Sequence, residues 1–348
     1  MTKPLSLVTG ACGFIGSHMI EVLQRAGHNI IATDLAAAYQ KDDPKIGRFP
    51  GVLKKLGVTF QPSDMTRPET LKPLVKGVDY VFHLAAVFNY SAPWHVLDRV
   101  NVQGTRDFCH LLREEKSLKH FILWGAGGVY GPVDPDMLPI TEDMAPAPPN
   151  NYLKSKWQQE YLVMEMNRTS GFPFSSIRPT TVYGPRGVYG GGQMLLDVAR
   201  LKVSIAPINL SGCLPFVHVE DVCRAALHLA LIEESKGEIY HLNDDSKMSL
   251  FEYLQFMARE NGNYFIPAPP IYLPPFKYLL LNVARILRPL AQLTGISSKF
   301  EADSVAYLGL DVTYSNEKLK KTGYSLVYPD ARDGIRDTLK WYRKEGWL

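Results

Sequence analysis

A glycine-rich turn near the N-terminus constrains this 348-residue chain more than any other feature. An apolar run, Leu5–Thr9, is typical of a strand, and Gly10, Gly13 and Gly16 follow it in a GxxGxxG spacing. A helical pattern, Ser17–Ala26, begins directly afterwards. The first glycine permits a tight turn, the second lets backbone approach a ligand, and the third lets the helix pack close to the strand. The segment therefore predicts a strand and a helix packed together through a tight turn.

Strand-like runs continue to alternate with helical patterns through the first half of the chain. Further strands are expected at Asn29–Thr33, Thr59–Pro62, Asp79–Leu84, His120–Trp124 and Phe174–Arg178. The segments His95–Arg113 and Tyr152–Asn167 carry helical patterns. Parallel strands need long crossover connections, so this alternation predicts a parallel sheet covered by helices on both faces. We predict an α/β fold with a doubly wound parallel sheet of the Rossmann type.

An acid at the end of the second expected strand indicates the ligand of this sheet. The free N–H groups and positive dipole end of the first helix suit the phosphates of a dinucleotide. Asp34 is placed to accept hydrogen bonds from a ribose 2′-hydroxyl, and its carboxylate would repel a 2′-phosphate. Residues 35–38 include no arginine that could hold that phosphate. We therefore predict NAD, rather than NADP, as the cofactor.

The second half of the chain has a different character. Proline and glycine cluster at residues 183–192 and again at 267–275, which predicts a smaller C-terminal substrate lobe. Two later segments, Phe216–Leu231 and Glu238–Asn243, still resemble a strand end with a helix and a strand. We expect residues 1–184 plus 216–243 to form the NAD-binding domain. Residues 185–215 plus 244–348 are expected to form the substrate lobe.

A tyrosine and a lysine share one face of the helical pattern that follows the fifth strand. Tyr152 and Lys156 are four residues apart, which places them on the same side of a helix. A phenol with a pKa of about 10 is a poor base at neutral pH, and a nearby ammonium lowers that pKa. We predict that Tyr152 is the catalytic acid or base and that Lys156 lowers its pKa. Hydride would meanwhile move to or from the nicotinamide.

Composition argues against several other functions. The chain has 38 Lys and Arg residues against 35 acids, a net charge of +3, and no basic run, so no nucleic-acid partner is expected. Its four cysteines show no CxxC pairing, so neither a metal site nor a disulfide framework is expected. The N-terminus has no signal-peptide pattern, and no long uncharged apolar stretch is present. A cytoplasmic protein is the expectation.

Eight motifs, in order and over nearly the whole chain, resemble the extended short-chain dehydrogenase/reductase family of the NAD-dependent epimerase/dehydratase superfamily. They are Thr9–Gly16, Asp64-Met65, His83–Ala86, Asn101–Thr105, Val129–Gly131, Tyr152 with Lys156, Arg178–Pro185 and Phe216–Val222. The resemblance implies cofactor contacts at Gly10, Gly13, Phe14, Ile15, Asp34, Asp64, Met65, Leu84, Ala85, Ala86, Tyr152, Lys156 and Pro179. It also implies that Lys156 binds the nicotinamide ribose, and that Asn101 and Asp221 brace the structure.

One position departs from that family. The family normally has Ser or Thr three residues before the Val-Tyr-Gly motif, and here Ala126 stands there. An alanine cannot donate a hydrogen bond to the reacting oxygen, and loss of such a donor typically costs about 10²–10³ in rate. Ser91, Thr180 and Thr181 are candidate substitutes. The acidic residues with which nucleotide-sugar dehydratases of the family perform elimination are also missing from positions 126–128, which argues against dehydration.

Two segments bear on the substrate. Family members that act on sugar nucleotides usually hold the diphosphate with an arginine just before the motif at Phe216, but residues 210–215 carry no charge. Residues 271–293 form a proline-led apolar pattern interrupted by Lys277, Arg285, Arg288 and Pro289. That pattern suits an amphipathic helix over an apolar pocket or at a membrane surface, with core packing or a dimer interface as alternatives. This layout, together with residues 83–91, resembles the 3β-hydroxysteroid dehydrogenase-like branch.

Three functional hypotheses follow. The first is an NAD-dependent oxidoreductase that interconverts a secondary alcohol and a ketone on a small hydrophobic substrate, steroid-like or lipid-like. The second is a sugar-nucleotide epimerase, which would retain NADH during turnover. The third, suggested by Ala126, is a non-catalytic NAD-binding regulatory protein. We also expect a homodimer and peripheral membrane contact through residues 271–293.

Overall fold

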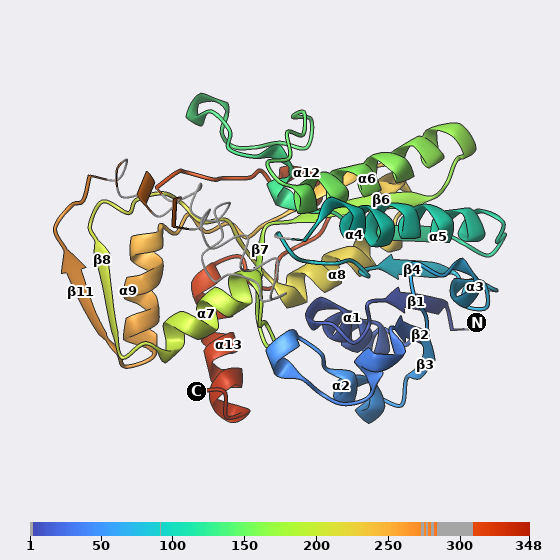
Figure 1. Ribbon diagram of the computed structural model, residues 1–348, viewed down its shortest axis with the longest axis horizontal. Coiled ribbons are helices and arrows are strands. Elements are labelled where there is room, and N and C mark those ends of the chain that lie inside the picture. The colour runs from blue at the N-terminus through green and yellow to red at the C-terminus, as the bar shows by residue number, and fades with distance from the viewer. Residues whose placement is uncertain (1–2, 91, 273–274, 276–277, 280–281, 284–308) are drawn as a thin grey trace.

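A seven-stranded sheet dominates the computed structural model, which describes residues 3–90, 92–272, 275, 278–279, 282–283 and 309–348 (Figure 1). The strand order is β10-β6-β5-β4-β1-β2-β3, and every neighbouring pair is parallel. The strands are β1 (Leu5–Thr9), β2 (Asn29–Asp34), β3 (Thr59–Pro62), β4 (Tyr80–His83), β5 (His120–Trp124), β6 (Phe174–Pro179) and β10 (Ile239–Leu242). The predicted doubly wound parallel sheet is confirmed.

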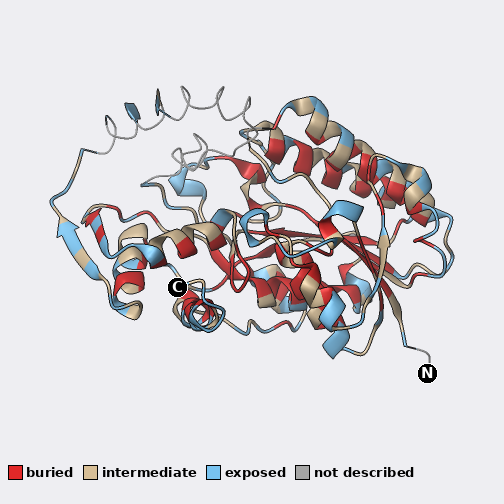
Figure 2. Ribbon diagram, turned by 60° about the horizontal axis from the view of Figure 1, so that its bottom comes forward, coloured by how far each residue is buried: buried red, intermediate tan, exposed pale blue. Residues whose placement is uncertain are grey.

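Helices cover both faces of this sheet because its strands alternate their side chains between two apolar layers. In β1, Leu7 packs into one layer and Val8 into the other. The layer around Val8 includes α1 (Phe14–Arg25), α2 (Pro50–Lys55) and α8 (Val219–Ala230). The layer around Leu7 includes α3 (Pro68–Leu71), α5 (Gly104–Arg113) and α6 (Asn151–Ser170). Figure 2 shows the buried residues concentrated on the sheet and on the inward faces of these helices.

The sheet reverses its winding direction beside β1. The chain runs outward from β1 through β2 to β3, and β4 then pairs with the other side of β1. Connections that leave the carboxyl ends of β1 and β4 therefore diverge and create a crevice, which is where ligands bind in sheets of this type. The glycine-rich turn follows β1 at this edge, and the segment that starts at Leu84 follows β4. The strand order thus brings together two of the motifs that the sequence indicated.

The segment between β4 and β5 departs from the single helix expected at His95–Arg113. It comprises α4 (Trp94–Leu97), a π-helical turn at Asp98–Gln103, and then α5. Asn101 in that turn is buried, and its Oδ1 accepts a hydrogen bond from the Val87 amide at 2.8 Å. Its Nδ2 donates to the Val87 carbonyl at 3.3 Å and to Ser155 Oγ at 3.0 Å. Asn101 therefore braces the loop after β4 against α6, as predicted.

The second half of the chain builds a separate cluster of buried side chains. Two parallel strand pairs lie outside the main sheet: β7 (Thr181–Tyr183) with β9 (Phe216–His218), and β8 (Val203–Pro207) with β11 (Tyr264–Ala268). The helices here are α7 (Gly190–Arg200), α9 (Leu250–Glu260), α12 (Glu317–Lys321) and α13 (Ala331–Lys344). Tyr183, Phe216, Tyr253, Ile335 and Tyr342 form much of the cluster. The expected division of the chain into two domains stays a prediction.

Asp221 fastens the C-terminal part of the chain to α8. Its carboxylate accepts hydrogen bonds from the backbone amides of Val327 and Tyr328 at 2.7 and 2.9 Å, and from the Tyr324 hydroxyl at 3.0 Å. The expected bracing role of Asp221 is confirmed. Within the described ranges, no helix combines the length and the apolar character that crossing a bilayer requires. Most of residues 271–293 lies outside those ranges, so the expected amphipathic helix stays a prediction.

Candidate active site

The turn after β1 leaves no room for side chains at two of its glycines. Gly10 has a φ of +66°, and a Cβ there would come within 2.9 Å of the Ala85 amide nitrogen. A Cβ at Gly16 would lie 2.1 Å from the Gly10 carbonyl oxygen. Gly13 is the N-cap of α1, whose first turn contains no acidic residue that would oppose an anion. The turn and the helix N-terminus therefore form a cradle that fits the pyrophosphate of a dinucleotide.

Asp34 is held against the same turn. One carboxylate oxygen accepts a hydrogen bond from the Cys12 amide at 3.1 Å, and the other accepts from the Leu35 amide at 2.8 Å. Burial raises the pKa of Asp34, and these two hydrogen bonds oppose that rise. The carboxylate therefore lies at the end of β2, beside the turn, where the ribose of a bound dinucleotide would lie.

Thr9 joins the ends of β1 and β4. Its Oγ1 accepts hydrogen bonds from the amides of Leu84 and Ala85 at 3.1 and 3.0 Å, and it lies 2.9 Å from His83 Nδ1. These contacts fix the backbone after β4, where the resemblance implied cofactor contacts at Leu84, Ala85 and Ala86. The structure therefore brings the glycine-rich turn and the segment after β4 into direct contact.

The remaining expected cofactor contacts lie on α1 or at the carboxyl edge of the sheet. Ile15 belongs to the first turn of α1, and Pro179 ends β6 beside Leu242 of β10. Asp64 follows β3 and accepts hydrogen bonds from the amide and hydroxyl of Thr66 at 2.8 and 2.7 Å. Burial opposes ionisation of Asp64, but the bonds from Thr66 lower the pKa overall. Met65 is buried beneath the start of α5, and a Cβ on Gly104 would lie 2.7 Å from its carbonyl oxygen.

Tyr152 stands among aromatic rings at the start of α6. The helix begins with a hydrogen bond from the Leu153 amide to the Asn150 side chain at 2.9 Å. The Tyr152 ring meets Phe88 and Tyr90 edge to face, with centroids 5.1 and 5.3 Å away. Burial raises the pKa of the Tyr152 phenol, and Tyr90 and Tyr189 raise it further. The expected lowering of this pKa by Lys156 stays a prediction.

Aromatic contacts connect Tyr152 with the glycine-rich turn. Phe88 touches Tyr152 on one side and Tyr189 on the other, the latter with centroids 5.4 Å apart. Tyr189 also meets Phe14 edge to face at 6.0 Å, and its hydroxyl accepts a hydrogen bond from the Phe14 amide at 3.3 Å. The candidate proton-transfer residue and the candidate phosphate cradle therefore belong to one site.

Lys156 lies one helical turn beyond Tyr152 and is only 4% exposed. Its Nζ donates a hydrogen bond to Gln159 Oε1 at 2.5 Å. Burial lowers the pKa of Lys156 to about 7, and the Glu160 carboxylate acts in the opposite direction. Gln159 Nε2 donates to Thr105 Oγ1 at 2.6 Å, and Thr105 Oγ1 lies 2.9 Å from His83 Nε2. A buried hydrogen-bonded chain thus links Lys156 with Thr9.

Ala126 belongs to the apolar surroundings of Tyr152. It packs against a cluster that contains Tyr152 and Leu97, and against a second one around Val129. Of the three candidate substitutes, Thr180 donates its hydroxyl to the Leu242 carbonyl at 3.2 Å, and Thr181 lies in β7. Ser91 lies outside the described residues. Which hydroxyl, if any, replaces the family's serine stays a prediction.

A buried ion pair connects α6 with strand β6 of the sheet. Arg178 Nε of β6 lies 3.1 Å from Glu160 Oε1, and both side chains are about 2% exposed. Ser176 Oγ donates to Glu160 Oε2 at 2.5 Å, and Arg178 also donates to the Tyr130 hydroxyl. Each member of the network therefore has a polar partner, which a buried charge pair requires. The network fixes α6, and with it Tyr152 and Lys156, on the sheet.

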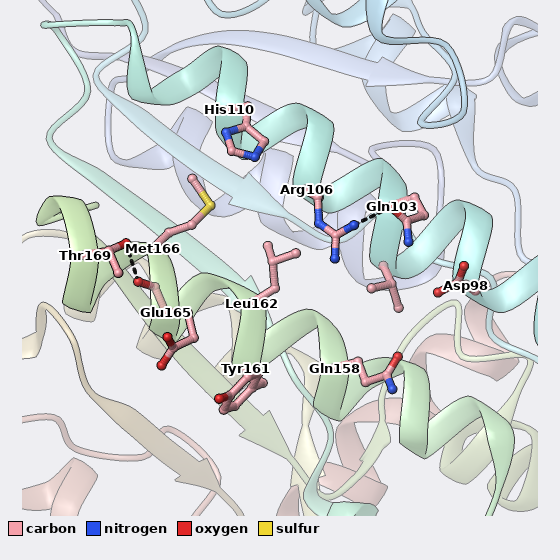
Figure 3. A pocket seen from close by; sticks show the side chains of 11 residues that line it. Asp98, Gln103, Arg106, His110, Gln158, Tyr161, Leu162, Glu165, Met166 and Thr169 are labelled. Carbon is pink, nitrogen blue, oxygen red and sulfur yellow. Dashed lines mark hydrogen bonds between the residues drawn. The ribbon is translucent and has the colours of Figure 1, made fainter.

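A surface groove between two helices is not part of this site. It has a volume of about 540 Å³ and lies between α5 and α6 (Figure 3). Asp98, Arg106, His110, Gln158 and Glu165 are among the residues that line it. None of these residues was expected in the site. The glycine cradle lies between β1 and α1, not between α5 and α6.

Three members of the site, Gln159, Thr105 and Tyr189, were not predicted from the motifs. Gln159 follows Lys156 by three residues, so helical spacing could have placed it beside the lysine. Thr105 falls within a motif that was recognised, but its partner lies on another helix. Tyr189 lies in the glycine-rich segment after β7, and no spacing rule connects it with Phe14. These contacts depend on the tertiary structure.

Together, the sheet, the glycine cradle at its winding reversal and the buried Tyr152 and Lys156 define a dinucleotide-binding enzyme of the dehydrogenase class. Residues 6–242 match the NAD dependent epimerase/dehydratase family. The chain belongs to this family, as an extended short-chain dehydrogenase/reductase.

Comparison with known proteins identifies related dehydrogenases. The chain is 30% identical over 326 residues to the sterol-4-alpha-carboxylate 3-dehydrogenase, decarboxylating, of Mus musculus, covering 90% of this chain and 84% of the mouse protein. It is 25% identical over 264 residues to the 3-beta-hydroxysteroid dehydrogenase of Mycolicibacterium neoaurum, covering 71% of this chain and 67% of that protein. The chain is therefore an NAD-dependent oxidoreductase acting on CH–OH groups.

Solved structures show the same fold. The crystal structure of gox2253 superposes with a TM-score of 0.76 at 26% identity, covering 99% of this chain and 100% of that one. The UDP-glucose 4-epimerase of Thermus thermophilus, in complex with NAD, superposes with a TM-score of 0.72 at 23% identity, covering 97% and 99%. NAD, which the family requires and the glycine cradle fits, is the cofactor.

Proposed function

We propose that this enzyme interconverts a secondary alcohol and a ketone on a steroid-like or lipid-like substrate. The observation that carries the proposal is the apolar surroundings of Tyr152, which contacts Phe88 and Tyr90 and shares a cluster with Leu97 and Ala126. A site of this composition suits an apolar substrate that presents one hydroxyl group. The sterol and hydroxysteroid names of two dehydrogenase relatives support the same class.

In the proposed reaction, Tyr152 exchanges the proton and Lys156 supports it. NAD, when bound, supplies the hydride acceptor or donor. During alcohol oxidation, Tyr152 Oη takes the hydroxyl proton as the C–H hydride leaves, and during ketone reduction it returns that proton to the oxygen. The Lys156 ammonium stabilises the phenolate and binds the nicotinamide ribose. Phe88 and Tyr90 pack against Tyr152, which is 7% exposed, and so limit the access of water to this proton transfer.

A sugar-nucleotide epimerase is the second candidate, because epimerases occur among the relatives and solved neighbours. Arg186 and Arg200, which precede the motif at Phe216, are the candidate ligands for a diphosphate. Arg186 pairs with Glu21 at 2.5 Å, and Arg200 donates to the Trp347 carbonyl at 3.2 Å. Because both arginines already have protein partners, the structure favours a substrate without a diphosphate.

The test is a screen of hydroxysteroids, alkyl β-hydroxy acids and UDP-sugars with NAD, followed by NADH absorbance. We expect NADH release with at least one hydroxylated lipid or steroid and none with UDP-sugars. Epimerisation of a UDP-sugar without release of NADH would instead establish the epimerase. If NAD binds, no substrate turns over and Tyr152→Phe changes nothing, the protein is a non-catalytic NAD-binding protein.

We also propose peripheral contact with a membrane, which would give the enzyme access to an apolar substrate. Besides the predicted helix at 271–293, the outward side of the β8–β11 pair supports this. Val203 pairs with Tyr264 and Ile205 with Ile266 in the strand register, and all four side chains are exposed, Ile205 at 63% and Tyr264 at 76%. Ile205→Asp should reduce flotation of the protein with phospholipid vesicles, whereas Leu231→Asp, at an exposed leucine of the α8 terminus, should not.

Location, oligomeric state and domain division are also proposals. We propose a cytoplasmic homodimer, with a molar mass in solution near twice 39.1 kDa by light scattering. We propose residues 1–184 plus 216–243 as the NAD-binding domain. A monomer at micromolar concentration would contradict the dimer.

A further inference from the structure

Gln159 connects Lys156 with the rest of the site. Its side chain is completely buried, its Oε1 accepts from Lys156 Nζ at 2.5 Å, and its Nε2 donates to Thr105 Oγ1 at 2.6 Å. A side-chain amide has one acceptor and one donor end, so Gln159 can satisfy an ammonium and a hydroxyl at the same time. An apolar residue could make neither contact, and a carboxylate could not donate to Thr105 Oγ1.

A further chain of hydrogen bonds connects Thr105 with Thr9. Thr9 Oγ1 already accepts from the amides of Leu84 and Ala85, so its two lone pairs are used and its own proton must go to His83 Nδ1. His83 then carries its proton on Nε2 and donates it to Thr105 Oγ1, 2.9 Å away. Burial and the charge of Lys156 lower the pKa of His83 to about 3, so the ring stays neutral.

Thr105 Oγ1 therefore accepts from His83, and its own proton and second lone pair would let it either donate to Gln159 or accept from it. The Lys156 ammonium can only donate, so Gln159 turns Oε1 toward Lys156 and Nε2 toward Thr105. The amide that holds Lys156 is thus connected, through Thr105 and His83, to Thr9, the residue immediately before the glycine-rich turn. The position of the ammonium is tied to the framework of the cofactor site.

Gln159 is also neutral, and this matters for the chemistry of Lys156. An uncharged carbonyl holds the ammonium without cancelling its charge, so the charge remains available to a Tyr152 phenolate. A carboxylate at the same distance would pair with the ammonium and raise the pKa of Lys156. The nearby carboxylate of Glu160 is engaged with Arg178 and Ser176.

We propose that Gln159 is a positioning residue for proton transfer: its neutral amide, anchored by the hydrogen-bonded chain through Thr105 and His83 to Thr9, holds the Lys156 ammonium without neutralising it. This inference rests on the proposed roles of Tyr152 and Lys156. It adds a requirement for an uncharged acceptor at this position, beyond the tyrosine and lysine of the active site.

The test compares the same charge change at a buried and at a partly exposed position of α6. Gln159→Glu places a carboxylate against Lys156, whereas Gln158→Glu places one in the outer groove between α5 and α6 (Figure 3). The first readout is the pKa of Lys156, measured by NMR on lysine-labelled protein without substrate. We expect Gln159→Glu to raise it by at least about one unit and Gln158→Glu to leave it unchanged. An unchanged Lys156 pKa in Gln159→Glu, or an equal rise in both variants, overturns the inference.

The second readout is the pH profile of kcat/KM for alcohol oxidation. We expect Gln159→Glu to move the rising limb upward by about one unit, a tenfold loss at neutral pH, with the NAD dissociation constant less affected. If Lys156 titrates as expected but the wild-type enzyme oxidises no alcohol, the proposed function fails while the placement of Lys156 by Gln159 stands. A normal pH profile with an altered Lys156 pKa would overturn the role in proton transfer.

A second pair of variants keeps the inference testable if Gln159→Glu does not fold. Thr105→Val preserves side-chain shape but removes the acceptor for Gln159 Nε2, and Thr105→Ser retains it. We expect Thr105→Val to lower kcat several-fold and Thr105→Ser to restore most of it. Equal losses in both variants would indicate a packing effect and contradict the hydrogen-bonded chain.

Discussion

The Asp34 carboxylate accepts a hydrogen bond from the backbone amide of Cys12, 3.1 Å away. The acid that ends β2 is thereby attached to the turn that follows β1, and not merely adjacent to it. Cys12 lies between Gly10 and Gly13, so the position of the carboxylate is linked to the shape of the phosphate cradle. The positions that we predict for ribose selection and for phosphate binding are consequently joined by a direct hydrogen bond.

NAD should bind much more tightly than NADP, because NADP would bring a phosphate dianion against Asp34. Asp34→Ala should narrow the difference between the two dissociation constants and weaken NAD binding itself. Titration of both cofactors at moderate salt measures this. Asp42→Ala, in an exposed loop, serves as the control. Equal affinities of the wild type for NAD and NADP would contradict the assignment.

Tyr152→Phe should reduce turnover by about 10²–10⁴ while NAD binding persists. The variant keeps the ring that packs against Phe88 and Tyr90 and removes only the hydroxyl. Steady-state rates and NAD titration measure the two effects separately. Tyr161→Phe removes a hydroxyl from an exposed tyrosine of the same helix and should leave both unchanged. Full activity of Tyr152→Phe would refute its role in proton transfer.

Ala126→Ser should add little to turnover, because we expect another hydroxyl, from Ser91 or Thr181, to assist the reacting oxygen. The added hydroxyl would also enter the apolar cluster beside Tyr152 and could crowd an apolar substrate. The measurement is kcat for Ala126→Ser beside Ser91→Ala and Thr181→Val. A large gain from the serine, with the other two variants unaffected, would show instead that the position is a weakened part of the active site.

Lys156 should make the stability of the protein depend on pH. Burial lowers the pKa of Lys156 from 10.5 to about 7. Between these values the unfolded chain binds a proton that the folded chain does not, so stability rises with pH in this window. Lys156→Met should therefore be more stable than the wild type below pH 7, and this advantage should shrink as the pH approaches 10.5.

Urea unfolding at about pH 6 and about pH 9 measures this difference in the free energy of unfolding. Lys154→Met, an exposed position on the same helix, is the control and should show little change with pH relative to the wild type. If the difference between Lys156→Met and the wild type is the same at both pH values, the ammonium is not destabilised by burial.

Local sequence patterns predicted the sheet and the cofactor cradle because their determinants are local. The glycine spacing requires the turn at Gly10, where a Cβ would strike Ala85, and alternating apolar runs require buried strands. The π-helical turn could not be predicted, because it depends on Asn101 reaching Val87 and Ser155 in other segments. The same applies to the contact between Gln159 and Thr105 on two different helices.

The resemblance to a family, by contrast, supplied the expected roles of Tyr152 and Lys156 but not their surroundings. Burial shifts the pKa of Lys156 downward and that of Tyr152 upward, and burial is a property of the completed fold. The aromatic contact of Tyr189 with Phe88 likewise depends on how the segment after β7 returns to the sheet.

The π-helical turn at Asp98–Gln103 sets the rotational phase of the helix between β4 and β5. Each residue of an α-helix rotates the chain by about 100° about the helix axis. A π-helical turn contains more residues per turn, so each of its residues contributes a smaller rotation. Leu97, before the turn, packs in the cluster of Tyr152, whereas Thr105, after it, reaches the amide that holds Lys156. A chain shorter by one residue here would still form a helix, but Thr105 would point in another direction. The length of this segment therefore determines whether one helix can contact both the surroundings of Tyr152 and the amide that binds Lys156.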